Sequence, residues 1–78
     1  MRYDIDGIMF SLADSIDDTM KRKKVTTREL ANRLGVKYQR VYRHKAGYVI
    51  PTLESLLKMC NALDVDLNEL IGAKHERR

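Results

Sequence analysis

The sequence contains few of the residues on which disulfide bonds, metal sites and sharp turns depend. Among its 78 residues are one cysteine, one proline, four glycines and two histidines. A single cysteine excludes an internal disulfide framework, and two isolated histidines provide no clustered ligands for a metal ion. We therefore expect a fold that needs no disulfide, metal or other cofactor, in a reducing, cytoplasmic setting.

Long apolar runs and catalytic constellations are also missing. No stretch approaches the roughly 18 apolar residues of a membrane span, and the opening residues MRYDIDGIMF lack the basic start and apolar centre of a signal peptide. A membrane-surface helix is disfavoured because Asp14, Asp17 and Asp18 would face anionic lipid. The chain has no nucleophile and base at a catalytic spacing, no separated pair of carboxylates and no phosphate-cradling glycine loop. We expect neither an enzyme nor a binding site for a small molecule.

Helical periodicity dominates what remains, since no segment sustains the period of two that a strand requires. An apolar stripe predicts a first helix over about residues 7–23 with Asp6 as its N-cap. The stripe comprises Ile5, Ile8, Met9, Leu12, Ala13, Ile16 and Met20. Thr26 and Glu29 match a Thr-x-x-Glu capping box at the start of a second helix, which Gly35 is expected to end.

Two further helices are expected near the carboxyl end. Thr52 caps the first of them, whose inward stripe is Leu53, Leu56, Leu57, Cys60 and Leu63. Asp66 caps a last short helix that contains Leu67, Leu70 and Ile71 and ends at Gly72. Cys60 is interpreted as a core residue, with a reactive or metal-binding thiol as the alternative. Residues 73–78 form a polar tail, which leaves residues 1–72 as a single all-α domain.

Acidic residues are absent from the stretch GVKYQRVYRHKAG, residues 35–47. Residues 21–45 hold ten basic residues and one acidic residue. Residues 1–20 hold one basic and five acidic residues, and residues 46–78 hold four basic and five acidic residues. One third of the chain thus carries the positive field, although the net charge is only +4. This concentration indicates a polyanionic partner. A solvated basic face without a partner is the alternative.

The same stretch has helical spacing. Together with the preceding helix and the turn at Gly35, it predicts a helix-turn-helix over about residues 27–45. Val36 and Val41 would fasten the second helix to the first, and Ala31 is small enough for a close approach. A helix of about eight residues spans roughly 12 Å, close to the width of the DNA major groove.

Taken together, VTTRELANRLGVKYQRVYRHKAG, a proline shortly after it and TLESLLKMCNALDVDLNELIG resemble the helix-turn-helix family of Cro and phage repressors, also called the xenobiotic-response-element family. The resemblance covers about residues 10–72, and the combination of pieces is specific although each piece alone is weak. It implies a compact, five-helix, lambda-repressor-like domain that binds double-stranded operator DNA, usually as a homodimer on a palindromic site. It also implies a transcriptional regulator, with repression as the expected mode, at the nucleoid of a bacterial or phage-infected cell.

By this resemblance the helix at residues 38–45 reads base edges. The family's base-facing positions are occupied here by Lys37, Tyr38, Gln39, Tyr42 and Arg43. Arg43 suits a bidentate bond to guanine and Gln39 one to adenine, while the two tyrosines suit a thymine methyl group or a phosphate. The predicted phosphate contacts are Thr27, Arg28, Arg40, Lys45 and Tyr48.

Three features depart from the family pattern. Met20 and Lys45 stand where members often pair an arginine with a glutamate, so both partners are missing together and Lys45 is left for phosphate. His44 replaces an aliphatic residue and is interpreted as a packed core residue rather than a pH-sensitive element. Lys37 replaces the serine or threonine that usually caps the reading helix.

Sequence-specific binding of double-stranded DNA is therefore the predicted function. A dimer is expected to use the acidic amino-terminal segment, the last helix or the apolar loop at residues 48–50. The alternative function is a protein-interaction adaptor, antitoxin-like or anti-repressor, that keeps the fold without binding DNA. RNA binding ranks behind both, because a short helix without a sheet offers little for stacked single strands.

Overall fold

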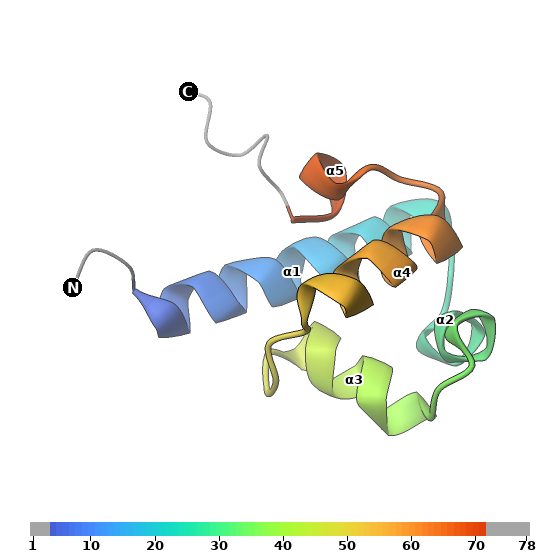
Figure 1. Ribbon diagram of the computed structural model, residues 1–78, viewed down its shortest axis with the longest axis horizontal. Coiled ribbons are helices and arrows are strands. Elements are labelled where there is room, and N and C mark those ends of the chain that lie inside the picture. The colour runs from blue at the N-terminus through green and yellow to red at the C-terminus, as the bar shows by residue number, and fades with distance from the viewer. Residues whose placement is uncertain (1–3, 72–78) are drawn as a thin grey trace.

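Five helices and no strand make up residues 4–71, the part of the chain that the computed structural model describes (Figure 1). The helices are α1 (Ile5–Lys23), α2 (Thr27–Leu34), α3 (Tyr38–Ala46), α4 (Leu53–Leu63) and α5 (Leu67–Ile71). The predicted all-α, five-helix fold with a helix-turn-helix is confirmed. The predicted stop at Gly72 and the tail at residues 73–78 lie outside the described residues.

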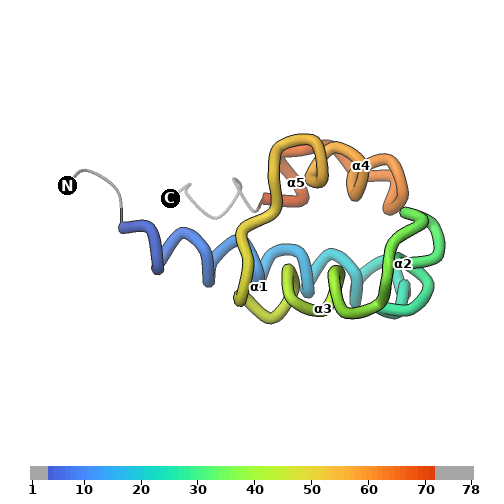
Figure 2. The backbone as a smooth tube through the Cα atoms, turned by 60° about the horizontal axis from the view of Figure 1, so that its bottom comes forward, coloured from blue at the N-terminus to red at the C-terminus, as the bar shows by residue number. Residues whose placement is uncertain are grey.

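The longest helix, α1, begins two residues earlier than predicted. Asp4 is its N-cap in place of Asp6, and an Asp4 carboxylate oxygen accepts a hydrogen bond from the Gly7 amide at 3.2 Å. The predicted apolar stripe is wrong for the first turns, where Ile5 and Ile8 are exposed. These turns extend past the other four helices (Figure 2), so no other described element covers them.

The core lies between α1, α2, α4 and α5, while α3 packs against α1 and α2. Each helix contributes one fully buried large apolar side chain: Ile16, Leu30, Val41, Met59 and Leu70. Because α3 packs against α1 and α2 packs against α4, the two helices of the helix-turn-helix are positioned by different supporting helices.

The fourth helix buries a narrower face than its apolar residues suggested. Leu53 is 62% exposed and Leu57 is also exposed, which corrects the predicted stripe. Met59 takes a central core position instead, next to Cys60 and Leu63. Since α1, α2 and α5 cover only one side of α4, its other leucines remain in contact with solvent. Burial raises the pKa of the Cys60 thiol, which fits a packed side chain better than a reactive one.

Caps and two long-range polar contacts fix the short helices. The predicted N-caps are present: Thr26 with Glu29 in a capping box, Thr52 and Asp66. Arg22 on α1 donates a hydrogen bond to the Glu69 carboxylate on α5 at 2.8 Å. Arg33 on α2 donates one to the backbone carbonyl of Ala62 on α4, also at 2.8 Å. These contacts connect elements that are distant in the sequence.

Candidate nucleic-acid interface

The connection between α2 and α3 sets the position of the second helix. Gly35 ends α2 with a φ of 71°, a left-handed conformation that glycine adopts without strain. The Val36 amide then donates to the Ala31 carbonyl at 3.0 Å. Lys37 precedes the first residue of α3, and its side chain makes no capping hydrogen bond. The residue that replaces the family's usual serine or threonine therefore does not cap α3.

The inner side of α3 holds the helix in place and its outer side is exposed. Val41 and His44 are buried. The five residues predicted to face DNA bases are all exposed: Lys37, Tyr38, Gln39, Tyr42 and Arg43. Within residues 4–71, the side chains of Lys37, Gln39 and Arg43 make no hydrogen bond or ion pair. Their donors and charges are available to an external partner.

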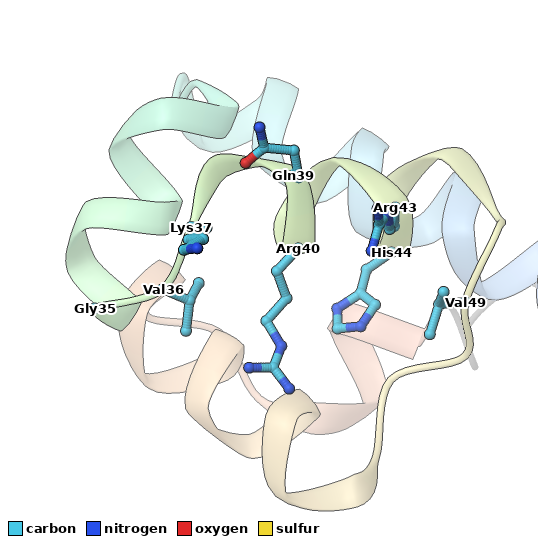
Figure 3. A pocket seen from close by; sticks show the side chains of 8 residues that line it. All are labelled: Gly35, Val36, Lys37, Gln39, Arg40, Arg43, His44 and Val49. Atoms are coloured by element: carbon cyan, nitrogen blue, oxygen red, sulfur yellow. The ribbon is translucent and has the colours of Figure 1, made fainter.

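An open groove of about 850 Å³ lies beside α3 (Figure 3). The residues that line it are Gly35, Val36, Lys37, Gln39, Arg40, Arg43, His44 and Val49. Gln39 points away from α4, whereas Arg40 points toward it. The structure therefore separates Arg40, which was predicted to contact phosphate, from the outward side that carries Gln39.

Three tyrosines form a row along the outer surface of α3. The ring centroids of Tyr38 and Tyr42 are 6.3 Å apart with planes 11° from parallel, and Tyr48 follows at 6.3 Å from Tyr42 with a tilt of 53°. The guanidinium carbon of Arg28, from α2, lies over the Tyr38 ring at 5.6 Å from its centroid, a cation–π distance. Arg28 and Tyr48, both predicted as phosphate contacts, thus adjoin two predicted base readers. We call Tyr38, Tyr42 and Tyr48 the tyrosine row.

A second basic cluster surrounds the start of α2. Lys21, Lys24 and Lys45 line a concave surface of about 430 Å³ together with Thr26 and Thr27. The first amides of a helix have no partner within it, so this position favours an anion. Thr27 itself is buried, which leaves little of its side chain for a ligand. Lys21 and Lys24 were not among the predicted DNA contacts; the available signal was the run of four basic residues at the end of α1, just before the capping box.

Lys45 is paired with an acid, which corrects the expectation that it stands unpaired. Its Nζ lies 3.4 Å from Oδ1 of Asp17 on α1, and Nζ of Lys21 lies 3.0 Å from Oδ2 of the same carboxylate. Burial raises the pKa of Asp17, but hydrogen bonds from Lys21 and Lys45 outweigh it, so the net pKa is lowered. The family often pairs an arginine and a glutamate at the positions of Met20 and Lys45. Here a pair of reversed sign joins the same two helices, with its acid, Asp17, three residues before Met20.

His44 is packed between helices, as predicted, and carries an unsatisfied nitrogen. The residue is 7% exposed, and within residues 4–71 its Nδ1 has no hydrogen-bond partner. It lines a space of about 350 Å³ between α3 and α4. Burial and then the charge of Arg40 lower the pKa of His44, so the neutral imidazole is favoured.

No group of three His, Cys, Asp or Glu residues among residues 4–71 is arranged to hold a metal ion. None of the described helices is long and apolar enough to cross a membrane.

The sequence of this part of the chain matches a known protein family. Residues 15–76 match a family model described as the Cro/C1-type HTH DNA-binding domain. A search of curated proteins found no match. The matched range contains both helices of the helix-turn-helix, the tyrosine row and the lysines around the start of α2.

Proposed function

The chain belongs to the Cro/C1-type helix-turn-helix family of DNA-binding domains, and from this premise we propose that it is a bacterial or phage transcriptional repressor that acts in the cytoplasm by occupying an operator. In this proposal α3 lies in the major groove of double-stranded DNA and reads its sequence. The observation that carries the proposal is the outer side of α3. The side chains of Lys37, Gln39 and Arg43 make no hydrogen bond or ion pair within residues 4–71, while the opposite side of the helix is buried.

The length and charge of α3 suit a major groove. Its nine residues span about 13 Å at about 1.5 Å per residue, and the groove is about 12 Å wide. No acidic residue occurs between Gly35 and Gly47. No carboxylate on this helix would therefore repel the phosphate groups on either side of the groove.

Arg43 and Gln39 are the proposed hydrogen-bonding readers. The planar guanidinium of Arg43 matches the O6 and N7 acceptors of guanine, and the amide of Gln39 matches the donor and acceptor of adenine. Lys37 would reach a base edge from the uncapped start of α3. Tyr38 and Tyr42 complete the base-facing set.

Phosphate contacts on either side of α3 would fix its register on the duplex. Near the start of α2, Lys45 would exchange Asp17 for a phosphate, and its neighbours Lys21 and Lys24 would add two further charges. The remaining proposed phosphate contacts are Thr27, Arg28, Arg40 and Tyr48.

A homodimer on a palindromic site would double these contacts. Exposed apolar side chains continue from the end of α3 into α4, and they are Val49, Ile50, Leu53 and Leu57. Burial of such residues between two copies would stabilise association at roughly 25 cal/mol per Å² of apolar area. Sedimentation of the protein alone and with operator DNA tests this, and a single copy bound to DNA would contradict it.

The decisive experiment is selection of bound sequences from a pool of random duplexes, followed by titration of the selected duplex at several salt concentrations. The proposal predicts one recovered motif, with two half-sites if a dimer binds. It also predicts that affinity falls by about 0.9 log units per phosphate contact for each tenfold rise in salt. No duplex binding at low salt would reject the proposal and favour the protein-interaction adaptor instead.

A further inference from the structure

The tyrosine row extends over more than one element and is held together before any ligand binds. Tyr38 and Tyr42 are one turn apart on α3, and Tyr48 follows the left-handed glycine that ends that helix. Arg28 contacts the other end of the row from α2. Tyr38 and Tyr42 are 43% and 41% exposed and Tyr48 is 69% exposed. The result is a continuous aromatic strip on the side of the domain that carries the proposed base readers.

Part of the ring surface is already in contact with other side chains of the protein. Tyr38 and Tyr42 stack on each other, and the Arg28 guanidinium lies over the Tyr38 ring. Proteins that hold single-stranded nucleic acid need open aromatic faces on which bases can stack. What the row offers is a series of partly exposed rings at a fixed spacing. Such rings suit contact with small apolar groups on a surface that lies across them.

Thymine is the base that presents such a group in the major groove, through its C5-methyl. We infer that the tyrosine row selects thymines by contact with their methyl groups, and that Arg28 is a positioning residue that holds Tyr38 in the row. The spacing of 6.3 Å between ring centroids is close to two base steps of about 3.4 Å each. The expected pattern is two thymines on one strand, two steps apart, read by Tyr38 and Tyr42.

This inference rests on the proposed function, because it requires α3 to lie in the major groove. It also reassigns Arg28 from phosphate binding to support of Tyr38. A guanidinium over an aromatic ring is attracted to the ring face, and the contact restricts the rotation of the aromatic side chain. Loss of Arg28 and loss of Tyr42 should therefore affect different thymines. Removal of Arg28 should disturb the thymine beneath Tyr38 and leave the one beneath Tyr42 unaffected.

The test removes the methyl group from the DNA. In the duplex recovered by selection, each thymine of the pair is replaced in turn by deoxyuridine, which keeps base pairing and lacks only the methyl. Binding of the full-length protein should weaken about fourfold for each replacement, which corresponds to about 0.8 kcal/mol for one buried methylene-sized group. Thymines elsewhere in the duplex serve as controls and should be replaceable without loss.

Three protein variants assign the effect to residues. Tyr42→Phe keeps the ring and should retain the fourfold difference between thymine and deoxyuridine at its position. Tyr42→Ala should bind both duplexes alike. Arg28→Gln should lose the difference at the Tyr38 thymine only. The side chains of Arg28 and Tyr42 are exposed, so their replacement is compatible with the fold, and thermal unfolding of each variant verifies this.

Several results would overturn the inference. They are a selected motif without thymines two steps apart, equal binding of thymine and deoxyuridine duplexes by the unmodified protein, or tighter binding of a single strand than of the duplex. A Tyr42→Phe variant that binds the thymine and deoxyuridine duplexes alike would do so too, because it would assign the discrimination to the hydroxyl. Failure to select any duplex sequence would instead reject the proposed function, so the two failures are distinguishable.

Discussion

Replacement of His44 by leucine tests whether a buried polar atom weakens the junction of α3 and α4. The imidazole is 7% exposed, and its Nδ1 finds no partner within residues 4–71. A buried polar group without a hydrogen bond costs about 1–3 kcal/mol. His44→Leu removes that group and fills the site with an apolar side chain of comparable size. For a domain of this length, 1 kcal/mol shifts the melting temperature by about 4–8 °C, so we expect a rise of roughly 4–24 °C at neutral pH.

The dependence on pH gives a second readout of the same site. The folded-state pKa of His44 is lowered from 6.5 by burial and by the charge of Arg40. The unfolded chain therefore takes up a proton at a higher pH than the folded chain does. The stability that this residue contributes is present above pH 6.5 and is lost as the pH falls through the lowered pKa. The melting temperature of the unmodified protein should fall more steeply below pH 6.5 than that of His44→Leu.

Thermal unfolding followed by circular dichroism, at several pH values, provides the assay. His44→Asn is the matched control, because it keeps a polar side chain in the site and loses the packing of the ring. That variant should melt below the unmodified protein. An unchanged melting temperature in His44→Leu, with the same pH dependence as the unmodified protein, would refute the reasoning and show that Nδ1 is satisfied.

Two further predictions concern the support of the interface. Asp17→Asn breaks the ion pair with Lys45, so duplex affinity should rise and its salt dependence should steepen by about 0.9 log units for each lysine that gains a phosphate. The fold should lose at most about 1 kcal/mol, because the ion pair is partly exposed. Salt titrations identical to those of the unmodified protein would contradict the prediction. Gly47→Ala should destabilise the protein more than Gly35→Ala in urea unfolding. Both positions have positive φ, but only a Cβ at Gly47 meets a neighbour, Phe10 Cδ1 at 3.1 Å. Equal losses would show that φ strain alone matters.

Local interactions made much of the fold predictable from the sequence. The Thr26 capping box and the Gly35 helix end involve residues within a few positions of one another, and both are present as predicted. Periodicity was less reliable where the extent of packing decides the outcome. Ile5 and Leu53 fit apolar stripes, yet both are exposed because no other described helix covers them. The pattern of a helix specifies a possible buried face and does not specify how much of it finds a partner.

The candidate interface was likewise predictable only in part. The exposed outer side of α3 followed from helical spacing, since Val41 and Arg43 must point in different directions. The Asp17 pair with Lys45 and the contact of Arg28 with Tyr38 did not follow, because each joins two helices whose relative placement the sequence pattern leaves open. Such contacts depend on the packing of α3 against α1 and α2.

The most direct test of the central claim compares the DNA sequence preferences of Arg43→Ala and Lys58→Ala. Both variants remove one positive charge, but Arg43 lies on α3 and Lys58 lies on α4, in an ion pair with Glu54. Binding of each variant is measured against the selected duplex and against its single-base changes. We predict that Arg43→Ala loses about 1–3 kcal/mol on the selected duplex together with the preference at one base pair, whereas Lys58→Ala keeps every preference. An Arg43→Ala variant that weakens all sequences equally would contradict the account.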